Sequence, residues 1–120
     1  MRNFLVRLNG EDETIDFARR LGAIIEEGTV VGLVGDLGAG KTTFVKGLAE
    51  GMKLGADVAV TSPTFALANV YGKTRKLAHI DLYRITTAQD VYGAGIEDFF
   101  FPPYSAAVEW FEKLAEAGCQ

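Results

Sequence analysis

Residues 35–43 read Gly35-Asp36-Leu37-Gly38-Ala39-Gly40-Lys41-Thr42-Thr43, and they satisfy the pattern G-x-x-x-x-G-K-[ST]. A strand-like apolar run at 30–34 precedes this stretch, and a helix-like run follows it. An ordinary glycine-rich turn is the alternative, but chance seldom supplies both glycines, the lysine and the threonine at this spacing. The strand, loop and helix together indicate a phosphate-binding loop.

The chemistry of this loop gives its residue types distinct roles. A triphosphate needs several backbone N–H donors close by, and Gly38 and Gly40 place no Cβ in the way. The following helix, expected to begin near Lys41, directs its N-terminal N–H groups at the anion, and Lys41 adds a mobile positive charge. The hydroxyl of Thr42 is suited to Mg²⁺. The expected cofactor-binding residues of this stretch are Gly38, Ala39, Gly40, Lys41, Thr42 and Thr43.

Composition sets the broad class of protein. With 120 residues, 48% apolar and 23% charged, the chain is expected to form one domain over 1–120. A net charge of -4 argues against broad, nonspecific nucleic-acid binding. The only cysteine, Cys119, offers no disulfide framework and favours a reducing compartment. No apolar run approaches the length of about 18 residues that crosses a membrane, so a cytoplasmic protein without a membrane partner is expected.

Hydrophobic periodicity predicts alternating strands and helices. In chain order, we expect a strand at 4–8, an amphipathic helix from the acidic residues 11–13 to Gly28, a strand at 29–34 buried on both faces, a helix from Thr42 to about Glu50, a β-hairpin of 65–71 and 76–82, a short helix at 87–92, a connection at 93–103, a buried strand at 106–108, and helix or tail from 111. This order predicts a three-layer α/β fold of the P-loop NTPase type, with a mostly parallel sheet and an antiparallel hairpin.

A second group of polar residues lies at 79–84, which reads His79-Ile80-Asp81-Leu82-Tyr83-Arg84. In a strand, the period of two puts His79, Asp81 and Tyr83 on one face and apolar side chains on the other. A carboxylate near the phosphate loop could hold Mg²⁺ through water or polarise the attacking water, which makes Asp81 a candidate catalytic residue. The alternative is an Asp81–Arg84 ion pair beside a half-buried histidine.

Glu109 directly follows the apolar run at 106–108. In P-loop proteins, a strand neighbouring the loop ends in an acidic residue close to Mg²⁺. Glu109 is therefore a candidate catalytic and metal-binding residue, and a solvated glutamate is the alternative. The next residue, Trp110, is interpreted as a core residue, with contact to the ligand left open.

Ser62 and Thr64 flank a proline in the segment before the expected hairpin. A hydroxyl-bearing loop at this place could reach the γ-phosphate and move after hydrolysis, so both residues are candidate cofactor contacts. A simple turn is the alternative.

Two further segments carry weaker signals. Lys73, Arg75 and Lys76 form a basic cluster in the expected hairpin turn, interpreted as a solvated tip, although RNA or an acidic partner could bind there. The aromatic run at 99–104 is expected to pack in the core, with an interaction surface as the alternative.

Four motifs, in this order and spacing, resemble the TsaE family, formerly called YjeE. They are Gly-Asp-Leu-Gly-Ala-Gly-Lys-Thr-Thr-Phe at 35–44, Ser-Pro-Thr-Phe at 62–65, His-x-Asp-Leu-Tyr-Arg at 79–84 and Val-Glu-Trp at 108–110. The resemblance implies an ATPase that acts with TsaB and TsaD in threonylcarbamoyl transfer to N6 of adenosine 37, in tRNAs that read codons starting with A. Contact with tRNA would then be indirect, through the complex.

The same resemblance implies roles for individual residues. It implies phosphate and Mg²⁺ binding by Lys41 and Thr42, a switch-like loop at 62–64, a catalytic Asp81, a Mg²⁺-associated Glu109 and, near the adenine, Thr14. Family members usually continue well past the Glu-Trp pair. The chain is therefore expected to be a P-loop ATPase domain that is short of the family's C-terminal segment.

Other functions compete with slow, Mg²⁺-dependent ATP hydrolysis. A small-molecule kinase is disfavoured because no arginine-rich lid is visible, and a GTPase would need an N-K-x-D motif that the chain lacks. The remaining alternative is a nucleotide-dependent docking module without significant turnover, whose bound state regulates its partners.

Overall fold

The computed structural model describes residues 10–34, 38–55, 60, 68–83, 89–90, 95–111 and 113. Its elements are α1 (Glu11–Ile24), β1 (Val30–Leu33), α2 (Gly38–Gly51), β2 (Ala68–Tyr71), β3 (Lys76–Asp81), the 3₁₀ helix η1 (Ile96–Phe100) and β4 (Tyr104–Glu109). The expected strand at 4–8 lies outside the described residues, as does the loop with Ser62 and Thr64. Of the helix expected at 87–92, only residues 89–90 are described, and they are helical.

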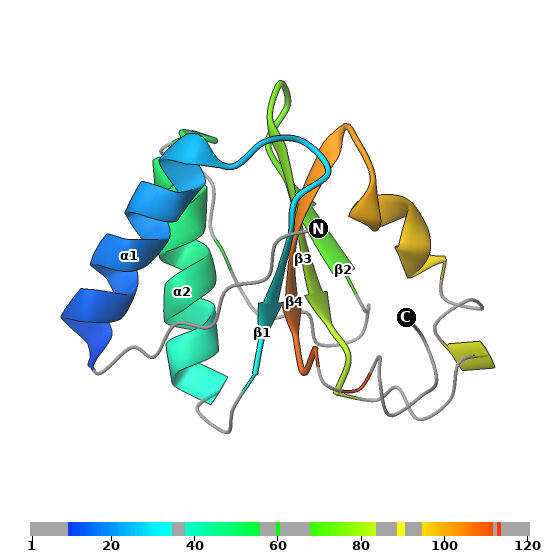
Figure 1. Cartoon of the computed structure of the whole chain (residues 1–120), viewed down its shortest axis with the longest axis horizontal. Coiled ribbons are helices and arrows are strands. Elements are labelled where there is room, and N and C mark those ends of the chain that lie inside the picture. The colour runs from blue at the N-terminus through cyan, green and yellow to red at the C-terminus, as the bar shows by residue number, and fades with distance from the viewer. Residues whose placement is uncertain are drawn as a thin grey trace.

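The four strands form one sheet in the order β1-β4-β3-β2 (Figure 1). β1 and β3 both pair in parallel with β4, and β2 pairs antiparallel with β3. This arrangement confirms the expected parallel sheet with an antiparallel hairpin. β4, the last strand in sequence, lies between β1 and β3 and is buried along most of its length, as its apolar run predicted.

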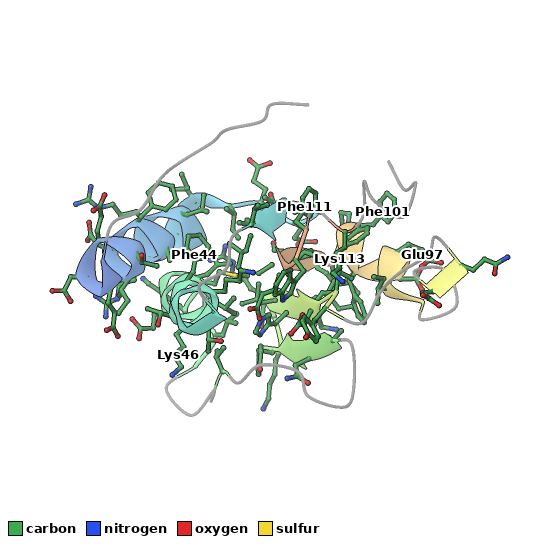
Figure 2. The ribbon with its side chains drawn as sticks, turned by 90° about the horizontal axis from the view of Figure 1, so that it is seen from below. Phe44, Lys46, Glu97, Phe101, Phe111 and Lys113 are labelled. Atoms are coloured by element: carbon green, nitrogen blue, oxygen red, sulfur yellow. The ribbon has the colours of Figure 1, made fainter. Side chains whose placement is uncertain are left out.

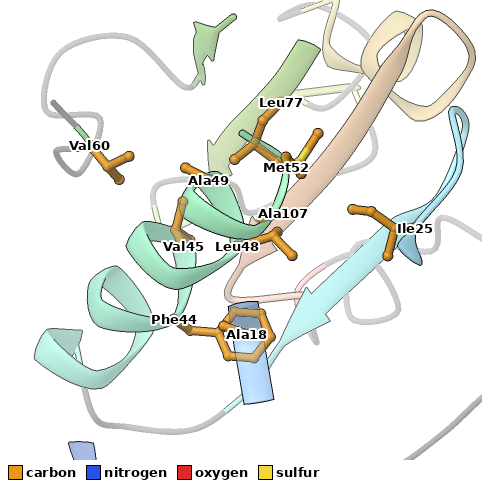
Figure 3. Packing of buried hydrophobic residues seen from close by; sticks show 10 residues of the cluster. All are labelled: Ala18, Ile25, Phe44, Val45, Leu48, Ala49, Met52, Val60, Leu77 and Ala107. Atoms are coloured by element: carbon orange, nitrogen blue, oxygen red, sulfur yellow. The ribbon is translucent and has the colours of Figure 1, made fainter. Parts of the chain in front are cut away.

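The sheet separates two apolar clusters, which gives the three layers expected from the sequence. On one face, α1 and α2 cover the sheet, and Phe44, Val45 and Leu48 of α2, together with Met52 directly after it, pack with strand residues such as Leu77 (Figure 3). On the other face, Ile96 of η1 packs against side chains of β3 and β4. The segment expected to be a plain connection therefore contains a 3₁₀ helix that covers the second face. None of the helices in the described part of the chain combines the length and the apolar character that a membrane span requires.

α1 and α2 run in the same direction, and their backbones approach each other closely (Figure 1). Glycines make this approach possible, since a Cβ at Gly51 would collide with the carbonyl oxygen of Arg19, and one at Gly22 with that of Leu48. The rings of Phe17 and Phe44 meet with centroids 6.2 Å apart. The two helices thus form a single, closely packed layer.

Burial of β1 on both faces was a wrong expectation. Val31 and Leu33 pack against the helical layer, but Val30 and the following Val34 are exposed, the latter by 68%. The cluster on the second face consists of residues from β3, β4 and η1, with no contribution from β1 among the described residues. On this face η1 lies over the neighbouring strands and, among the described residues, the ring of Phe111 lies against Gly32 of β1, which leaves Val30 and Val34 exposed.

The basic cluster in the hairpin turn is only partly solvated. Lys73 is exposed, as expected. The guanidinium of Arg75, however, donates hydrogen bonds to the carbonyl oxygens of Gly22 (3.2 Å), Ile25 (3.0 Å) and Met52 (3.2 Å). These carbonyls lie at the C-terminal ends of α1 and α2, which a cation stabilises. The interpretation of Arg75 as part of a solvated tip was therefore wrong.

The aromatic run at 99–104 divides between core and surface. Phe99 and Tyr104 form an edge-to-face pair with centroids 5.0 Å apart, beside the second apolar cluster. Phe101 is exposed. Core packing is thus confirmed for part of this run.

Candidate active site

The ends of three parallel strands form one row at the edge of the sheet. Leu33 of β1 pairs with Glu109 of β4, and Glu109 pairs with Asp81 of β3. The glycine-rich stretch leaves β1 directly after this row and enters α2. α2 begins at Gly38, not near Lys41 as expected, so Gly38, Ala39 and Gly40 belong to its first turn. The N–H groups without helical partners therefore lie in the glycine-rich stretch itself.

Lys41 occupies the first turn of α2 and is only 6% exposed. Its Nζ is buried and has no hydrogen-bond partner among the residues that the structure describes. The ammonium instead lies 4.0 Å from the centroid of the Trp110 ring, in a cation–π contact. A buried cation without an acceptor is costly unless an anion joins it, and a phosphate group would meet that need.

Trp110 is held from several sides. Its φ of 59° is in the left-handed region, which turns the chain sharply after β4. The ring of Tyr83 packs against it at 5.4 Å, and the Nζ of Lys113 lies 6.0 Å from its centroid. Lys113 also donates a hydrogen bond to the carbonyl oxygen of Tyr83 (2.8 Å). Trp110 therefore belongs to the site through Lys41, although it also packs at the margin of the second apolar cluster.

Glu109 is buried, with 4% exposure, and its Oε2 lies 2.6 Å from Nε2 of the fully buried His79. The alternative interpretation of Glu109 as a solvated residue was therefore wrong, and so was that of His79 as half-buried. Nδ1 of His79 has no hydrogen-bond partner within the described part of the chain. His79 is the site residue that sequence reasoning did not select, although its place two residues before Asp81 put it on the polar face of the strand.

Asp81 is the last residue of β3 and is half-buried. Its Oδ1 accepts a hydrogen bond from the backbone N–H of Tyr83 (2.9 Å). Burial raises the pKa of Asp81, and the negative charge of Glu109 raises it further, against the opposing effects of the Tyr83 N–H, His79 and Lys41. Because these groups all act on one carboxylate, Lys41, His79, Asp81 and Glu109 share a single electrostatic environment.

The other predicted site residues that the structure describes are Thr42, Thr43 and Thr14, and they differ in whether they lie near Lys41. Thr42 and Thr43 lie half-buried in the first turns of α2, beside Lys41. Thr14 lies in α1, where its hydroxyl donates to the carbonyl oxygen of Gly10 (2.8 Å). The structure therefore brings together Lys41, Asp81 and Glu109, and it shows a purely local bond for Thr14.

The donor set suits Mg²⁺ better than a transition metal. The described residues contain no group of three or more His, Cys, Asp or Glu side chains that could hold a metal alone. Mg²⁺ is usually bound by one or two carboxylates together with water and substrate phosphates. The hydroxyl of Thr42 and the carboxylate of Glu109 are oxygen donors of the required kind.

The sheet, the loop between β1 and α2, and the acidic ends of β3 and β4 define an α/β protein of the P-loop NTPase type. Residues 8–119 match the family model described as "Threonylcarbamoyl adenosine biosynthesis protein TsaE", and the chain belongs to this family. The resemblance expected from the four motifs is thereby confirmed.

Individual relatives agree with the family assignment. The chain is 41% identical over 103 residues to a protein of Treponema pallidum named tRNA threonylcarbamoyladenosine biosynthesis protein TsaE, covering 86% of this chain and 75% of that protein. A protein of the same name from Aquifex aeolicus is 41% identical over 111 residues, covering 90% and 77%. The crystal structure of Bacillus subtilis YdiB superimposes with a TM-score of 0.67 at 30% identity, covering 96% of this chain and 72% of YdiB.

Proposed function

We propose that this chain binds ATP with Mg²⁺ and hydrolyses it slowly, as a component of the bacterial machinery that installs N6-threonylcarbamoyl on adenosine 37 of tRNAs reading codons that start with A. The observation that carries the proposal is the buried Lys41 ammonium, which lacks a hydrogen-bond partner among the described residues and lies at the strand ends that carry Glu109 and Asp81. The names of the relatives support the role in tRNA modification.

The phosphates would bind at the start of α2. The N–H groups of the first turn and the ammonium of Lys41 are donors suited to the β- and γ-phosphates, since both a helix N-terminus and a lysine attract anions. Thr42 and Glu109 would hold Mg²⁺, which neutralises charge on the phosphate oxygens when it is bound. Ser62, Thr64 and Thr14 are proposed as further nucleotide contacts.

Hydrolysis would depend on positioning and charge, with no covalent intermediate. Phosphoryl transfer is catalysed chiefly by orienting the nucleophile and stabilising the developing charge. Asp81, at the strand end beside Glu109, would orient the attacking water by accepting its hydrogen bond. Lys41 would follow the negative charge as it moves toward the leaving phosphate.

The proposed setting is the cytoplasm, with TsaB and TsaD as protein partners and tRNA reached through the complex. The test measures ATP binding by calorimetry and phosphate release by the 120-residue chain, each with and without TsaB and TsaD, in Mg²⁺ and in EDTA. We expect Mg²⁺-dependent binding and slow turnover that the partners stimulate. Binding without turnover under all conditions would favour the docking module, and absence of ATP binding would refute the nucleotide site.

A further inference from the structure

The contact between His79 and Glu109 joins two buried side chains on neighbouring strands. His79 is 0% exposed, and its Nε2 lies 2.6 Å from Oε2 of Glu109. Both residues lie on the face of the sheet that the helical layer covers, as do their neighbours Leu77 and Ala107. The contact is therefore short and shielded from solvent, which strengthens its electrostatic component.

An ionised carboxylate only accepts hydrogen bonds, so opposite an ionised Glu109 it is Nε2 of His79 that carries the hydrogen and donates it to Oε2 of Glu109. The neutral tautomer with its hydrogen on Nε2 carries none on Nδ1, the nitrogen without a partner among the described residues. This tautomer therefore leaves no buried N–H group of the ring without an acceptor.

A glutamate side chain has three rotatable bonds, and burial alone does not select one orientation of its carboxylate. His79 is held in a strand and has only two such bonds, so it can restrain Glu109. With Oε2 bound to His79, the second carboxylate oxygen of Glu109 remains for a ligand. Asp81 in the paired register position and Lys41 on α2 are the other charged groups that act here.

We propose that His79 is a positioning residue that holds the Glu109 carboxylate in the orientation required for Mg²⁺-dependent nucleotide chemistry. This inference rests on the proposed function. Outer partners that orient a metal-linked carboxylate typically change metal affinity or activity by about 10- to 100-fold when they are removed. His79 itself touches neither nucleotide nor metal in this role.

The test compares two substitutions of His79 in the full chain with TsaB and TsaD present. His79→Leu removes the donor, whereas the side-chain amide of His79→Gln can still donate to Glu109. We expect His79→Leu to lower kcat by about 10- to 100-fold with a small change in KM for ATP, and His79→Gln to recover most of kcat. Calorimetry should show that the gain in ATP affinity on adding Mg²⁺ shrinks in His79→Leu and returns in His79→Gln.

A double-mutant cycle tests whether His79 acts through Glu109. If it does, His79→Leu combined with Glu109→Gln is no slower than Glu109→Gln alone. Val108→Ala is the matched control, because Val108 is a fully buried neighbour of Glu109 on the opposite face of β4. Thermal unfolding of all variants reports any general loss of stability. Val108→Ala should retain kcat even where its loss of thermal stability equals that of His79→Leu.

The outcomes separate this inference from the proposed function. A parent chain without Mg²⁺-dependent ATP binding overturns both. If the parent binds ATP with Mg²⁺ but His79→Leu keeps the kinetics of the parent, the positioning role alone is overturned. The same holds if the effects of His79→Leu and Glu109→Gln on kcat are additive, or if Val108→Ala loses as much kcat as His79→Leu.

Discussion

The Nζ of Lys41 lies 4.0 Å from the centroid of the Trp110 ring, and it has no hydrogen-bond acceptor among the described residues. A cation–π contact contributes about 0.5 to 2 kcal/mol, whereas a hydrogen bond to a charged group contributes about 1.5 to 3 kcal/mol. Several phosphate oxygens would therefore outcompete the indole for the ammonium. Binding of nucleotide should move Lys41 from the ring to the phosphates.

Trp110 should report this movement, since it is the only tryptophan in the chain. Addition of Mg-ATP should remove the cation from the face of the Trp110 ring and shift the emission maximum or intensity of its fluorescence. The change should be absent in Lys41→Ala and retained in Asp81→Ala, because only the latter keeps the phosphate-binding charge. Fluorescence that stays constant at nucleotide concentrations shown by calorimetry to saturate the protein would contradict the coupling of the two residues.

Lys41→Ala should weaken ATP binding by about 10- to 100-fold, the equivalent of one charged hydrogen bond. The fold should survive, because the substitution removes a buried charge without an acceptor among the described residues. Lys46→Ala is the control, since Lys46 lies on the same helix but points away from α1 and the sheet (Figure 2). Calorimetry that finds equal affinities for the two folded variants would refute the phosphate-loop assignment.

Asp81→Asn should change how stability depends on pH. Because the pKa of Asp81 is raised in the folded state, the folded protein holds this proton more tightly than the unfolded chain does. Protonation of Asp81 therefore stabilises the folded parent protein at low pH. This stabilisation is lost as pH rises from the ordinary pKa of aspartate through the raised pKa of Asp81. The amide introduced by the substitution cannot ionise, and its carbonyl oxygen can still accept from the N–H of Tyr83.

The free energy of unfolding of Asp81→Asn, relative to the parent, should consequently increase as pH rises through this window. Denaturant titrations at several pH values give this difference directly. At neutral pH, the variant should be at least as stable as the parent while its ATP hydrolysis falls more than its ATP binding. A difference in stability that decreases with rising pH would contradict the direction of the shift.

Arg75→Met should lower the free energy of unfolding by about 2 kcal/mol, because it leaves helix-end carbonyl oxygens of Gly22, Ile25 and Met52 without their charged donor. The exposed Lys73 provides the matched control, and Lys73→Met should cost little. Urea unfolding measures both. Equal stability of the two variants would mean that water replaces Arg75 at the helix ends.

The sequence predicted the elements that depend on local pattern. The apolar run at 106–108 predicted a buried strand, and the two runs around 72–75 predicted a hairpin, because turn residues and hydrophobic periodicity are encoded within a few positions. Burial of β1 on both faces was wrongly predicted. It depends on where η1 packs, and the sequence pattern around β1 does not encode that long-range contact. The same holds for Arg75, whose three acceptors lie 23 to 53 residues away.

The candidate site was predictable as a set of residue types and only in part as a geometry. The motif located Lys41, and the strand ends located Asp81 and Glu109. Their shared row follows from the register of β3 with β4, which places Asp81 opposite Glu109. The contact of His79 with Glu109 depends on that register across 30 residues, and the contact of Lys41 with Trp110 depends on the left-handed turn at Trp110.

The anchoring of the helix ends by Arg75 has a mechanical consequence. Arg75 precedes β3, whereas Asp81 ends it, so Arg75 lies at the opposite end of the strand from the row formed by Leu33, Glu109 and Asp81. Arg75 binds the carbonyl oxygen of Met52, directly after the C-terminal end of α2 and far from Lys41, and the glycines of α2 allow it to pack closely against α1. Arg75 therefore fixes the helix pair at the end remote from Lys41, so any movement of the pair relative to the sheet should be smallest at Arg75 and largest at the first turn of α2.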